Sequence, residues 1–234
     1  MAHNQPTNRL LACLSSADLA LLHDHLEPIQ LRFRQQLESA RKIKHAYFIE
    51  RGIASVVAIG NGERPQAEVT IVGREGMIGH AIVLGIDRWP YDTFMQVEGN
   101  GQRISVDDLR ALIEKSASLK ATLLRYAYVF SIQAGHTALA NAQGKLEERL
   151  ARWLLMAHDR TAGDELPLTH EFLAMMLGVR RSGVSVALQG FAKRGLVSMA
   201  RGLIIVIDRD GLEDGANGLY GVPEAEYDRL FHTT

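Results

Sequence analysis

Two adjacent arginines and two nearby serines make up the most specific candidate site in this sequence. Arg180 and Arg181 begin a helical pattern, and Ser182 and Ser185 follow within its first turns. An arginine donates two hydrogen bonds to O6 and N7 of guanine, and a serine hydroxyl bonds a phosphate or a base edge. The four side chains are therefore candidate contacts to a nucleic acid.

A glycine corner is predicted to hold these side chains out from the surface. Residues 168–197 contain two helical patterns that meet at Gly178, and glycine takes the left-handed backbone conformation that ends a helix at low cost. Thr169 is predicted to cap the first helix, with Leu168 and Leu173 as a hydrophobic staple around the cap. The second helix would then enter the major groove of DNA, as in helix-turn-helix proteins.

A predicted β-hairpin after the second helix supplies one more basic side chain. The stretch GLVSMARGLIIVID turns near Gly202, which would place Arg201 at the tip of a wing, where it meets a phosphate. Residues 169–207 hold five basic residues and one acidic residue, a net charge of +4, so the rest of the chain carries −5 of the total of −1. A basic module on an acidic body is typical of a nucleic-acid reader. The predicted DNA contacts are Thr169, Arg180, Arg181, Ser182, Ser185 and Arg201.

The segment before this module changes from a strand pattern to a helix pattern. Short β-leaning runs separated by glycine-rich turns fill residues 29–104, which predicts a barrel or a sandwich. Ser105 then opens a helix as its N-cap, with Asp107 and Asp108 in the first turn. Further along, apolar and mixed residues recur in alternating steps of four and three, the heptad spacing of two helices packed side by side.

Two interpretations of this heptad stripe are open. One is a seam between two copies of the chain, which is favoured because the stripe is long and joins the two halves of the sequence. The other is an amphipathic helix packed on its own barrel. The predicted dimer interface consists of Leu119, Leu123, Tyr126, Phe130, Gln133 and Thr137.

Length and composition indicate an ordinary globular protein. The chain has 234 residues, of which 47% are hydrophobic and 23% are charged, enough for a sizeable core in one or two domains. Cys13 is its one cysteine, which excludes an internal disulfide and fits a reducing cytoplasm. We find no apolar run of about 18 residues and no secretion signal, so neither a membrane span nor export is expected.

The motifs together resemble the Crp/Fnr superfamily of transcription regulators, named for the cyclic-AMP receptor protein and the fumarate-nitrate regulator. The resemblance is strongest in EERLARWLLMAHDR and LPLTHEFLAMMLGVRRSGVSVAL, and looser in YFIERGIASVV, GREGMIG and RISVDDL. It implies an α+β fold with an N-terminal β-roll over 1–110, a dimerisation helix over 111–143 and a C-terminal winged helix-turn-helix over 144–234. It also implies a cytoplasmic homodimer on a palindromic operator in double-stranded DNA, with RNA polymerase as a further partner.

Two departures from the family pattern bear on the signal and on the operator. Members that bind cyclic nucleotides carry an Arg-Ser or Arg-Thr pair for the phosphate, and Asp92-Thr93 stands about there in this chain. An aspartate repels a phosphate, so we do not expect a cyclic nucleotide as the effector, and we leave open which small signal, if any, the β-roll senses. In the recognition helix, Ser182 and Val186 replace a Glu and an Arg of relatives resembling the cyclic-AMP receptor protein, so the preferred operator should differ.

Other chemistry is weakly represented. An iron–sulfur cluster needs about four thiolates, and Cys13 is alone. His80 is a conceivable haem ligand, but a single histidine in an apolar run is more often a packed core residue, so no cofactor or metal is predicted. Glu63, Glu68 and Glu75 lack a recognisable nucleophile beside them, so we do not expect an enzyme. The alternative function is a ligand-binding or protein-interaction module whose helix-turn-helix no longer binds DNA.

Overall fold

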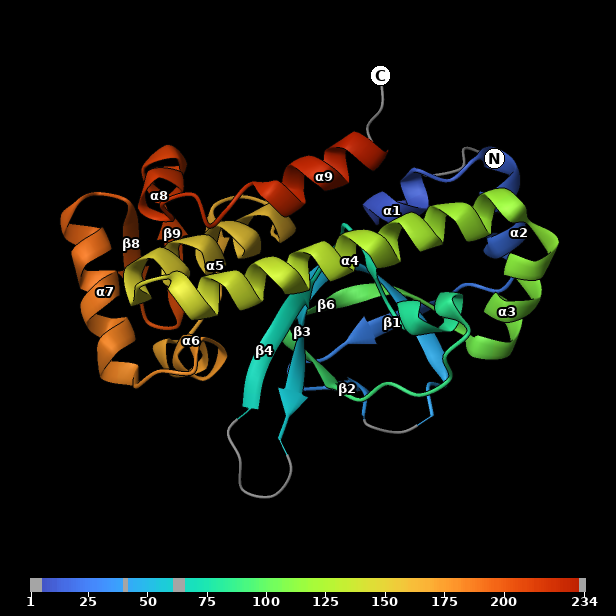
Figure 1. Cartoon of the computed structure of the whole chain (residues 1–234), viewed down its shortest axis with the longest axis horizontal. Helices are drawn as coiled ribbons and strands as arrows, with labels where there is room; N and C mark the ends of the chain where they lie inside the picture. Colours follow the sequence, from blue (N-terminus) through green and yellow to red (C-terminus); the bar gives the residue numbers. More distant parts are fainter. Residues whose placement is uncertain (1–5, 40–41, 61–65, 232–234) are drawn as a thin grey trace.

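The two halves of the chain form two units that lie side by side, and one long helix runs along both. The structure is a computed structural model, and it describes residues 6–39, 42–60 and 66–231. An antiparallel sheet forms the N-terminal half, helices and a small sheet form the C-terminal half, and α4 (Ala117–Gln143) runs along both (Figure 1). The predicted α+β fold is confirmed. None of the helices in the described part of the chain has the length and apolarity that crossing a membrane requires.

The N-terminal half is a β-roll built on two long, bent strands. Its strands are β1 (Glu27–Leu31), β2 (Gln36–Glu38), β3 (His45–Ile59), β4 (Gln66–Val72), β5 (Met77–Ile78) and β6 (Asp92–Ser105). They pair in the order β1-β6-β3-β4, with β2 added to β6 and β5 added to β3. The register between β3 and β6 shifts at several points, and such bulges bend a strand and increase its twist. The bent strands enclose a core that includes Ile49, Val56 and Met95.

Short helices flank the β-roll and lead into α4. They are α1 (Arg9–Ala12), α2 (Ser16–His23), the 3-10 helix η1 (His80–Leu84) and α3 (Val106–Lys115). Ser105 caps α3 as predicted, accepting the backbone N–H of Asp108 at 3.1 Å. The long helix begins at Ala117 rather than near 111. Ser116 ends α3 with an extended backbone, and its hydroxyl accepts the N–H of Leu119 at 3.1 Å, so it caps a new helix.

The heptad stripe of α4 packs on the chain's own β-roll. Its six residues, Leu119, Leu123, Tyr126, Phe130, Gln133 and Thr137, are all between 0% and 8% exposed. The Gln133 amide donates to the carbonyl of Ile71 in β4 at 2.9 Å, and Leu119 and Leu123 join an apolar cluster with η1 and α3. Side chains this deeply buried within one chain do not reach a second copy. Their assignment to a dimer interface is therefore wrong, and the second interpretation of the stripe holds.

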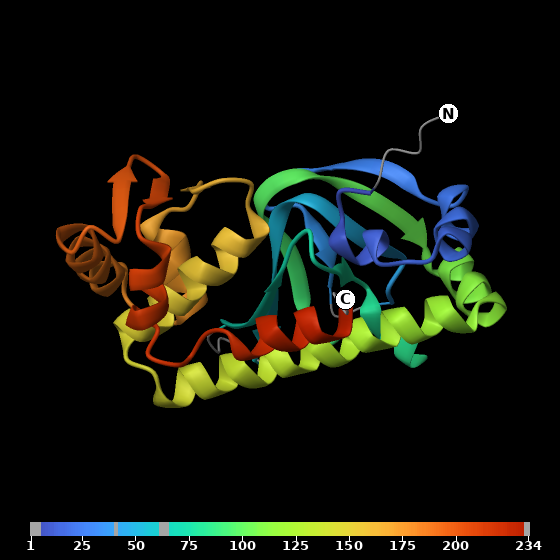
Figure 2. The ribbon, with the colours of Figure 1, turned by 90° about the horizontal axis from the view of Figure 1, so that it is seen from above.

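The C-terminal half is a winged helix-turn-helix followed by a returning helix. Its elements are α5 (Leu146–Arg160), β7 (Glu165–Leu166), α6 (His170–Leu177), α7 (Arg181–Lys193), β8 (Val197–Ala200), β9 (Leu203–Val206), α8 (Arg209–Gly215) and α9 (Val222–Phe231). The small sheet has the order β7-β9-β8. The final helix, α9, leaves this half and lies along α4 beside the β-roll (Figure 2). We did not predict this return from the sequence.

A buried polar contact joins α5 to the outer face of the β-roll. The indole N–H of Trp153 in α5 donates to the Glu68 carboxylate in β4 at 2.7 Å. The other oxygen of Glu68 accepts from Ser55 in β3 at 3.0 Å. Around this contact, β-roll residues such as Ile53 and Ile71 share one apolar cluster with α5 and α6. The helix-turn-helix is therefore packed on the β-roll rather than tethered to it.

We predict that the Glu68 carboxyl makes stability depend on pH. Burial raises its pKa to about 7 from the ordinary 4.5, although the hydrogen bonds from Trp153 and Ser55 act in the opposite direction. Because the folded chain holds this proton more tightly than the unfolded chain, the free energy of unfolding should fall as pH rises from about 4.5 to about 7. Glu68→Gln should remove that part of the dependence, about 1–3 kcal/mol, in urea unfolding on either side of this range.

Two other carboxyl groups serve as comparisons for the pH dependence assigned to Glu68. Glu38 is also buried with its pKa raised to about 7, so its own contribution should remain in the variant. Glu98→Gln changes an exposed carboxylate on β6 and should leave the wild-type profile intact. If Glu68→Gln has the same pH profile as the wild type, the Glu68 carboxyl is ionised in the folded protein and the prediction fails.

Candidate nucleic-acid interface

Helix α6 begins and ends as the sequence predicts. The Thr169 hydroxyl accepts the backbone N–H of Phe172 at 3.2 Å, and this N-cap is flanked by Leu168 and Leu173, both buried. Gly178 takes the left-handed conformation, with φ 64° and ψ 35°. The chain turns there without strain, because only a residue lacking a Cβ adopts this conformation at low cost.

Helix α7 presents its first turn to solvent. Arg180 stands at the N-cap with an extended backbone and makes no side-chain cap, and α7 starts at Arg181. Arg180, Arg181 and Ser182 are exposed, whereas Val184 and Leu188 on the opposite face are fully buried. Within the described ranges, neither arginine forms an ion pair with an acidic side chain. Two cations without a protein partner thus lie beside unsatisfied helix N–H groups, an arrangement suited to an anion.

Ser185 has a different environment from the other predicted contacts. Its hydroxyl donates to the Arg181 carbonyl at 3.1 Å and lies 2.9 Å from Nδ1 of His170. Because the serine proton is used on Arg181, the serine oxygen accepts from the histidine ring. Ser185 therefore bridges α7 to the start of α6. We did not identify His170 from the sequence, because this contact spans 15 residues and arises only from the crossing of two helices.

The wing and the middle of α7 complete the surface. Strands β8 and β9 pair as a hairpin that turns at Arg201 and Gly202, and Arg201 is exposed there, as the sequence predicted. Val186 is 66% exposed in α7. An apolar side chain at such a position suits the methyl group of thymine. This surface thus offers cations for phosphate or guanine and one apolar contact.

Other candidate groups are used within the fold. His80 is buried between Phe130 and Trp89, with ring centroids 4.0 Å and 4.9 Å away, and burial lowers its pKa to about 4. Its ring is therefore neutral and packed in the core. Glu75 pairs with Arg160 at 2.8 Å. Glu63 lies outside the described residues. In the part of the chain that the structure covers, no three His, Cys, Asp or Glu side chains gather as metal ligands.

Comparisons with known proteins agree with this geometry. Residues 148–214 match the family model of the Crp-like helix-turn-helix domain, a family of DNA-binding transcription regulators, which are generally not enzymes. FixK2 of Bradyrhizobium japonicum is similar in structure, with 13% identity, a TM-score of 0.70, and 81% of this chain and 96% of that chain covered. No curated protein sequence matches the chain.

Two regulators from Thermus thermophilus have a similar fold. A Crp-family transcriptional regulator has 18% identity and a TM-score of 0.67, with 81% of this chain and 97% of that chain covered. A second regulator, of the CRP/FNR family, has 19% identity and a TM-score of 0.63, with 83% of this chain and all of that chain covered. At these identities the structures establish a shared fold.

Two glycine substitutions should have opposite effects on stability, because the corner requires a left-handed backbone and the helix that follows it does not. Gly178→Ala places a Cβ at φ 64° with nothing within 4 Å of it, so its cost is backbone strain alone, about 1–2 kcal/mol. Gly190 has equally open space but lies inside α7 with ordinary helical backbone, so Gly190→Ala should stabilise the protein by about 0.5–1 kcal/mol. Urea unfolding of both variants measures the two effects. Destabilisation by Gly190→Ala, or none by Gly178→Ala, would refute this account of the corner.

Proposed function

We propose that this chain binds a specific operator in double-stranded DNA as a homodimer. The support is a Crp-like helix-turn-helix domain at residues 148–214 and a fold shared with regulators of the Crp/Fnr family. The main support for the proposal is the exposed first turn of α7. There Arg180, Arg181 and Ser182 are exposed together, and nothing in the described chain neutralises the two arginines. In helix-turn-helix proteins this end of the second helix meets the base edges in the major groove.

The remaining contacts in the proposal divide by role. Arg181 reads a guanine, Arg180 and Arg201 meet phosphates, and Thr169 lies at the N-terminus of α6, where backbone N–H groups also suit a phosphate. Ser185 supports Arg181 from within the helix through the hydrogen bond to its carbonyl. Phosphate contacts fix the position of the protein on DNA, whereas base contacts select the sequence.

Arg181→Ala is expected to weaken binding to the preferred operator by about 1–3 kcal/mol and to relax the preference at one base pair per half-site. The reason is the loss of a two-bond contact to guanine. Affinities for the preferred and the substituted operators, measured by fluorescence anisotropy over a range of salt, test this directly. Arg51→Ala removes the same charge from an exposed position on β3 and serves as the matched control.

Two other outcomes would contradict this assignment. An equal loss on all sequences would make Arg181 a phosphate contact. A wild-type affinity for all DNA that is weak and insensitive to salt would favour the alternative, an interaction module without DNA binding, because phosphate contacts produce a steep salt dependence.

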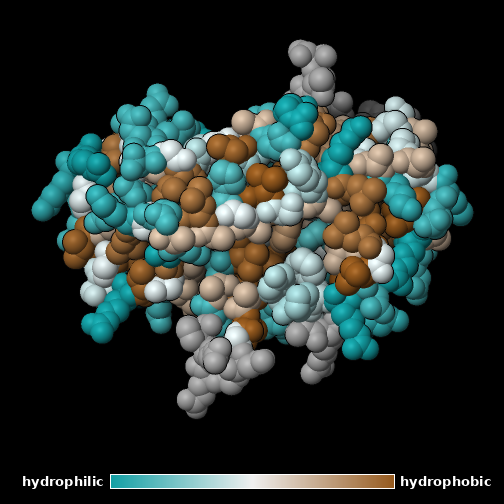
Figure 3. Space-filling model, viewed as in Figure 1, coloured by the Kyte–Doolittle hydropathy of each residue, from teal (hydrophilic) through white to brown (hydrophobic). Residues whose placement is uncertain are grey.

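A different face of α4 supports the homodimer. Exposed residues recur there in alternating steps of four and three, and most of them are small or apolar. They are Leu124, Tyr128, Ser131, Gly135, Ala138 and Ala142. Figure 3 shows this face, with brown and pale side chains along α4 between teal patches. Small residues let two helices approach closely, and the spacing is that of a two-helix seam. A two-fold dimer would present two recognition helices to half-sites about 34–36 Å apart.

Gly135→Glu should convert the homodimer to a folded monomer. A Cβ at this position meets nothing within 4 Å, so the monomer accepts the side chain, whereas two glutamates would face each other across an apolar seam. Light scattering should show half the wild-type mass, and circular dichroism should be unchanged. Ala111→Glu, at an exposed site on α3, should stay dimeric. A dimeric Gly135→Glu, or a monomeric wild type at micromolar concentration, would contradict this seam.

We also propose that the effector is not a cyclic nucleotide. Thr93, in the segment where relatives hold a phosphate, is fully buried and donates its hydroxyl to the Glu38 carboxylate at 3.1 Å. Asp92 precedes it, so acidic groups stand where the family pattern requires an arginine. Placing a phosphate beside the partly buried Asp92 and the buried Glu38 costs electrostatic energy, which supports a signal of different chemistry.

A further inference from the structure

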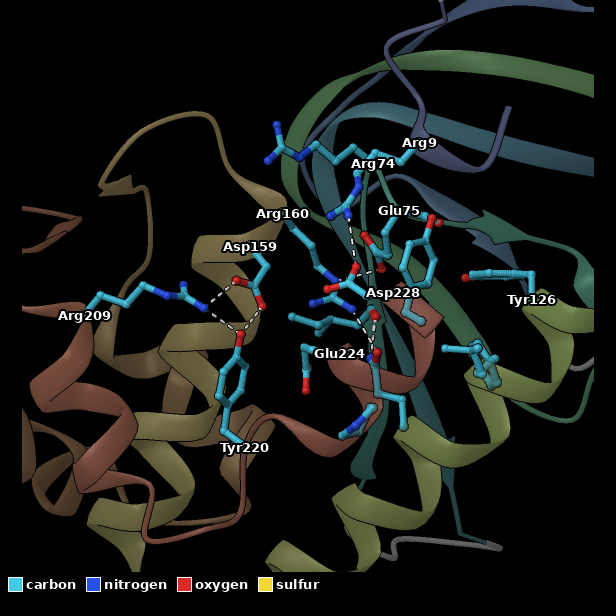
Figure 4. Close-up of a pocket in the computed structure, with 16 residues that line it drawn as sticks. Arg9, Arg74, Glu75, Tyr126, Asp159, Arg160, Arg209, Tyr220, Glu224 and Asp228 are labelled. Atoms are coloured by element: carbon cyan, nitrogen blue, oxygen red, sulfur yellow. Dashed lines mark hydrogen bonds and ion pairs between the residues drawn. The ribbon is translucent and has the colours of Figure 1, made fainter. Parts of the chain in front are cut away.

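A cavity lies where the two halves of the chain and α9 meet. It has a volume of about 290 Å³ and is bounded by the turn between β4 and β5, by α4, by the end of α5 and by the segment from α8 to α9. Figure 4 shows Arg209 and Tyr220 on one side of it, and Glu75 and Tyr126 on the other. The cavity is large enough for a small organic molecule, and it is separate from the helix-turn-helix surface.

Most of the charged groups around the cavity are already matched. Arg160 pairs with Glu75 at 2.8 Å, Arg209 pairs with Asp159 at 2.9 Å, and Arg9 pairs with Asp228 at 3.5 Å. The Glu224 carboxylate accepts the N–H of Gly221 at 3.1 Å and lies in the field of Arg152 and Arg160. These pairs connect the elements around the cavity. Its acidic side chains already lie beside arginines, so the cavity is not suited to a cationic ligand.

Arg74 is the exception. Among the described residues it forms no ion pair, and its Nε is buried without a hydrogen-bond partner although the side chain as a whole is half-buried. A buried donor without an acceptor costs free energy that a suitable ligand atom would recover. A guanidinium is best satisfied by a carboxylate, which accepts two parallel hydrogen bonds from it.

Part of the remaining wall is apolar. Ile71, Val129, Phe130 and Pro223 line the cavity beside the charged groups. The turn that carries Arg74 lies within the GREGMIG motif, whose role the sequence did not reveal. A Cβ on Gly73 would come within 2.8 Å of Arg160, so this glycine lets a buried arginine form part of the wall.

We propose that this cavity binds a small organic monocarboxylate with an apolar body, its carboxylate on Arg74 and its body against the apolar wall. One negative charge matches Arg74, the one cation lining the cavity that forms no ion pair within the described part of the chain. A dianionic phosphate is disfavoured because Glu75 and Asp228 line the same cavity. As an effector site this proposal rests on the proposed function, since ligand here would touch the β-roll, α4 and α9 at once. Binding itself is measured without DNA and does not depend on that function.

Isothermal titration of the full chain with benzoate and with hexanoate tests the proposal. At least one of them should bind saturably at millimolar concentration, whereas benzamide, hexanamide and inorganic phosphate should not. Arg74→Gln should weaken the binding about ten- to a hundredfold, the value of a charge-assisted hydrogen bond. Arg74→Lys should retain part of it, and Arg51→Gln, which removes an exposed arginine elsewhere, should leave it unchanged.

Each outcome decides the proposal. Failure of both carboxylates to bind the wild type overturns it, and so does equal binding of the carboxylates and their amides. Carboxylate binding that Arg74→Gln leaves intact, with circular dichroism showing a folded variant, places the ligand elsewhere and also overturns it. Binding of phosphate in preference to both carboxylates would replace the monocarboxylate with a dianion and refute the assignment.

Discussion

A buried arginine at the end of α5 is the interaction on which the arrangement of the molecule depends. The Arg160 guanidinium, in a side chain 5% exposed, donates to Glu75 of the β-roll at 2.8 Å and to Gln133 of α4 at 2.9 Å. A third bond closes on the Met156 carbonyl of its own helix at 2.8 Å. Removing one partner of a buried ion pair leaves an uncompensated charge and costs about 3–5 kcal/mol. The three elements are therefore held in one geometry.

The hydrogen bonds of Arg160 constrain the residues and helices around it. The turn at Gly73 has to lack a side chain for Arg160 to approach, and Gln133 has to face inward to reach the guanidinium. The same helix α4 therefore uses one face for its own β-roll and has only its other face free. Helix α9 adds a second connection, because the Tyr227 hydroxyl donates to the Glu75 carbonyl at 2.9 Å. The residue that holds Arg160 is thus also fixed by the C-terminal helix.

The helix-turn-helix shows how far local sequence rules extend. Thr169, Gly178 and the turn at Arg201 and Gly202 act through neighbours within a few residues, so their roles were predictable from the chain itself. The bridge from His170 to Ser185 was not, since it depends on how two helices cross. Ser185 is correspondingly less available to a ligand than its position on a helical wheel suggests.

The sequence by itself determined the helix caps, the glycine corner, the wing, the alternation of strands and turns and the family resemblance, because each rests on local propensity or on a contiguous motif. Tertiary structure decided which partner covers each apolar face. The spacing of Leu119, Leu123 and Phe130 marks a buried stripe but is the same for a β-roll as for a second helix, and only the fold shows that the β-roll occupies it. The return of α9, the junction at Arg160 and the cavity beside Arg74 likewise join residues far apart in the chain, such as Arg9 and Asp228. No local pattern encodes such contacts, since they form only when the whole core packs.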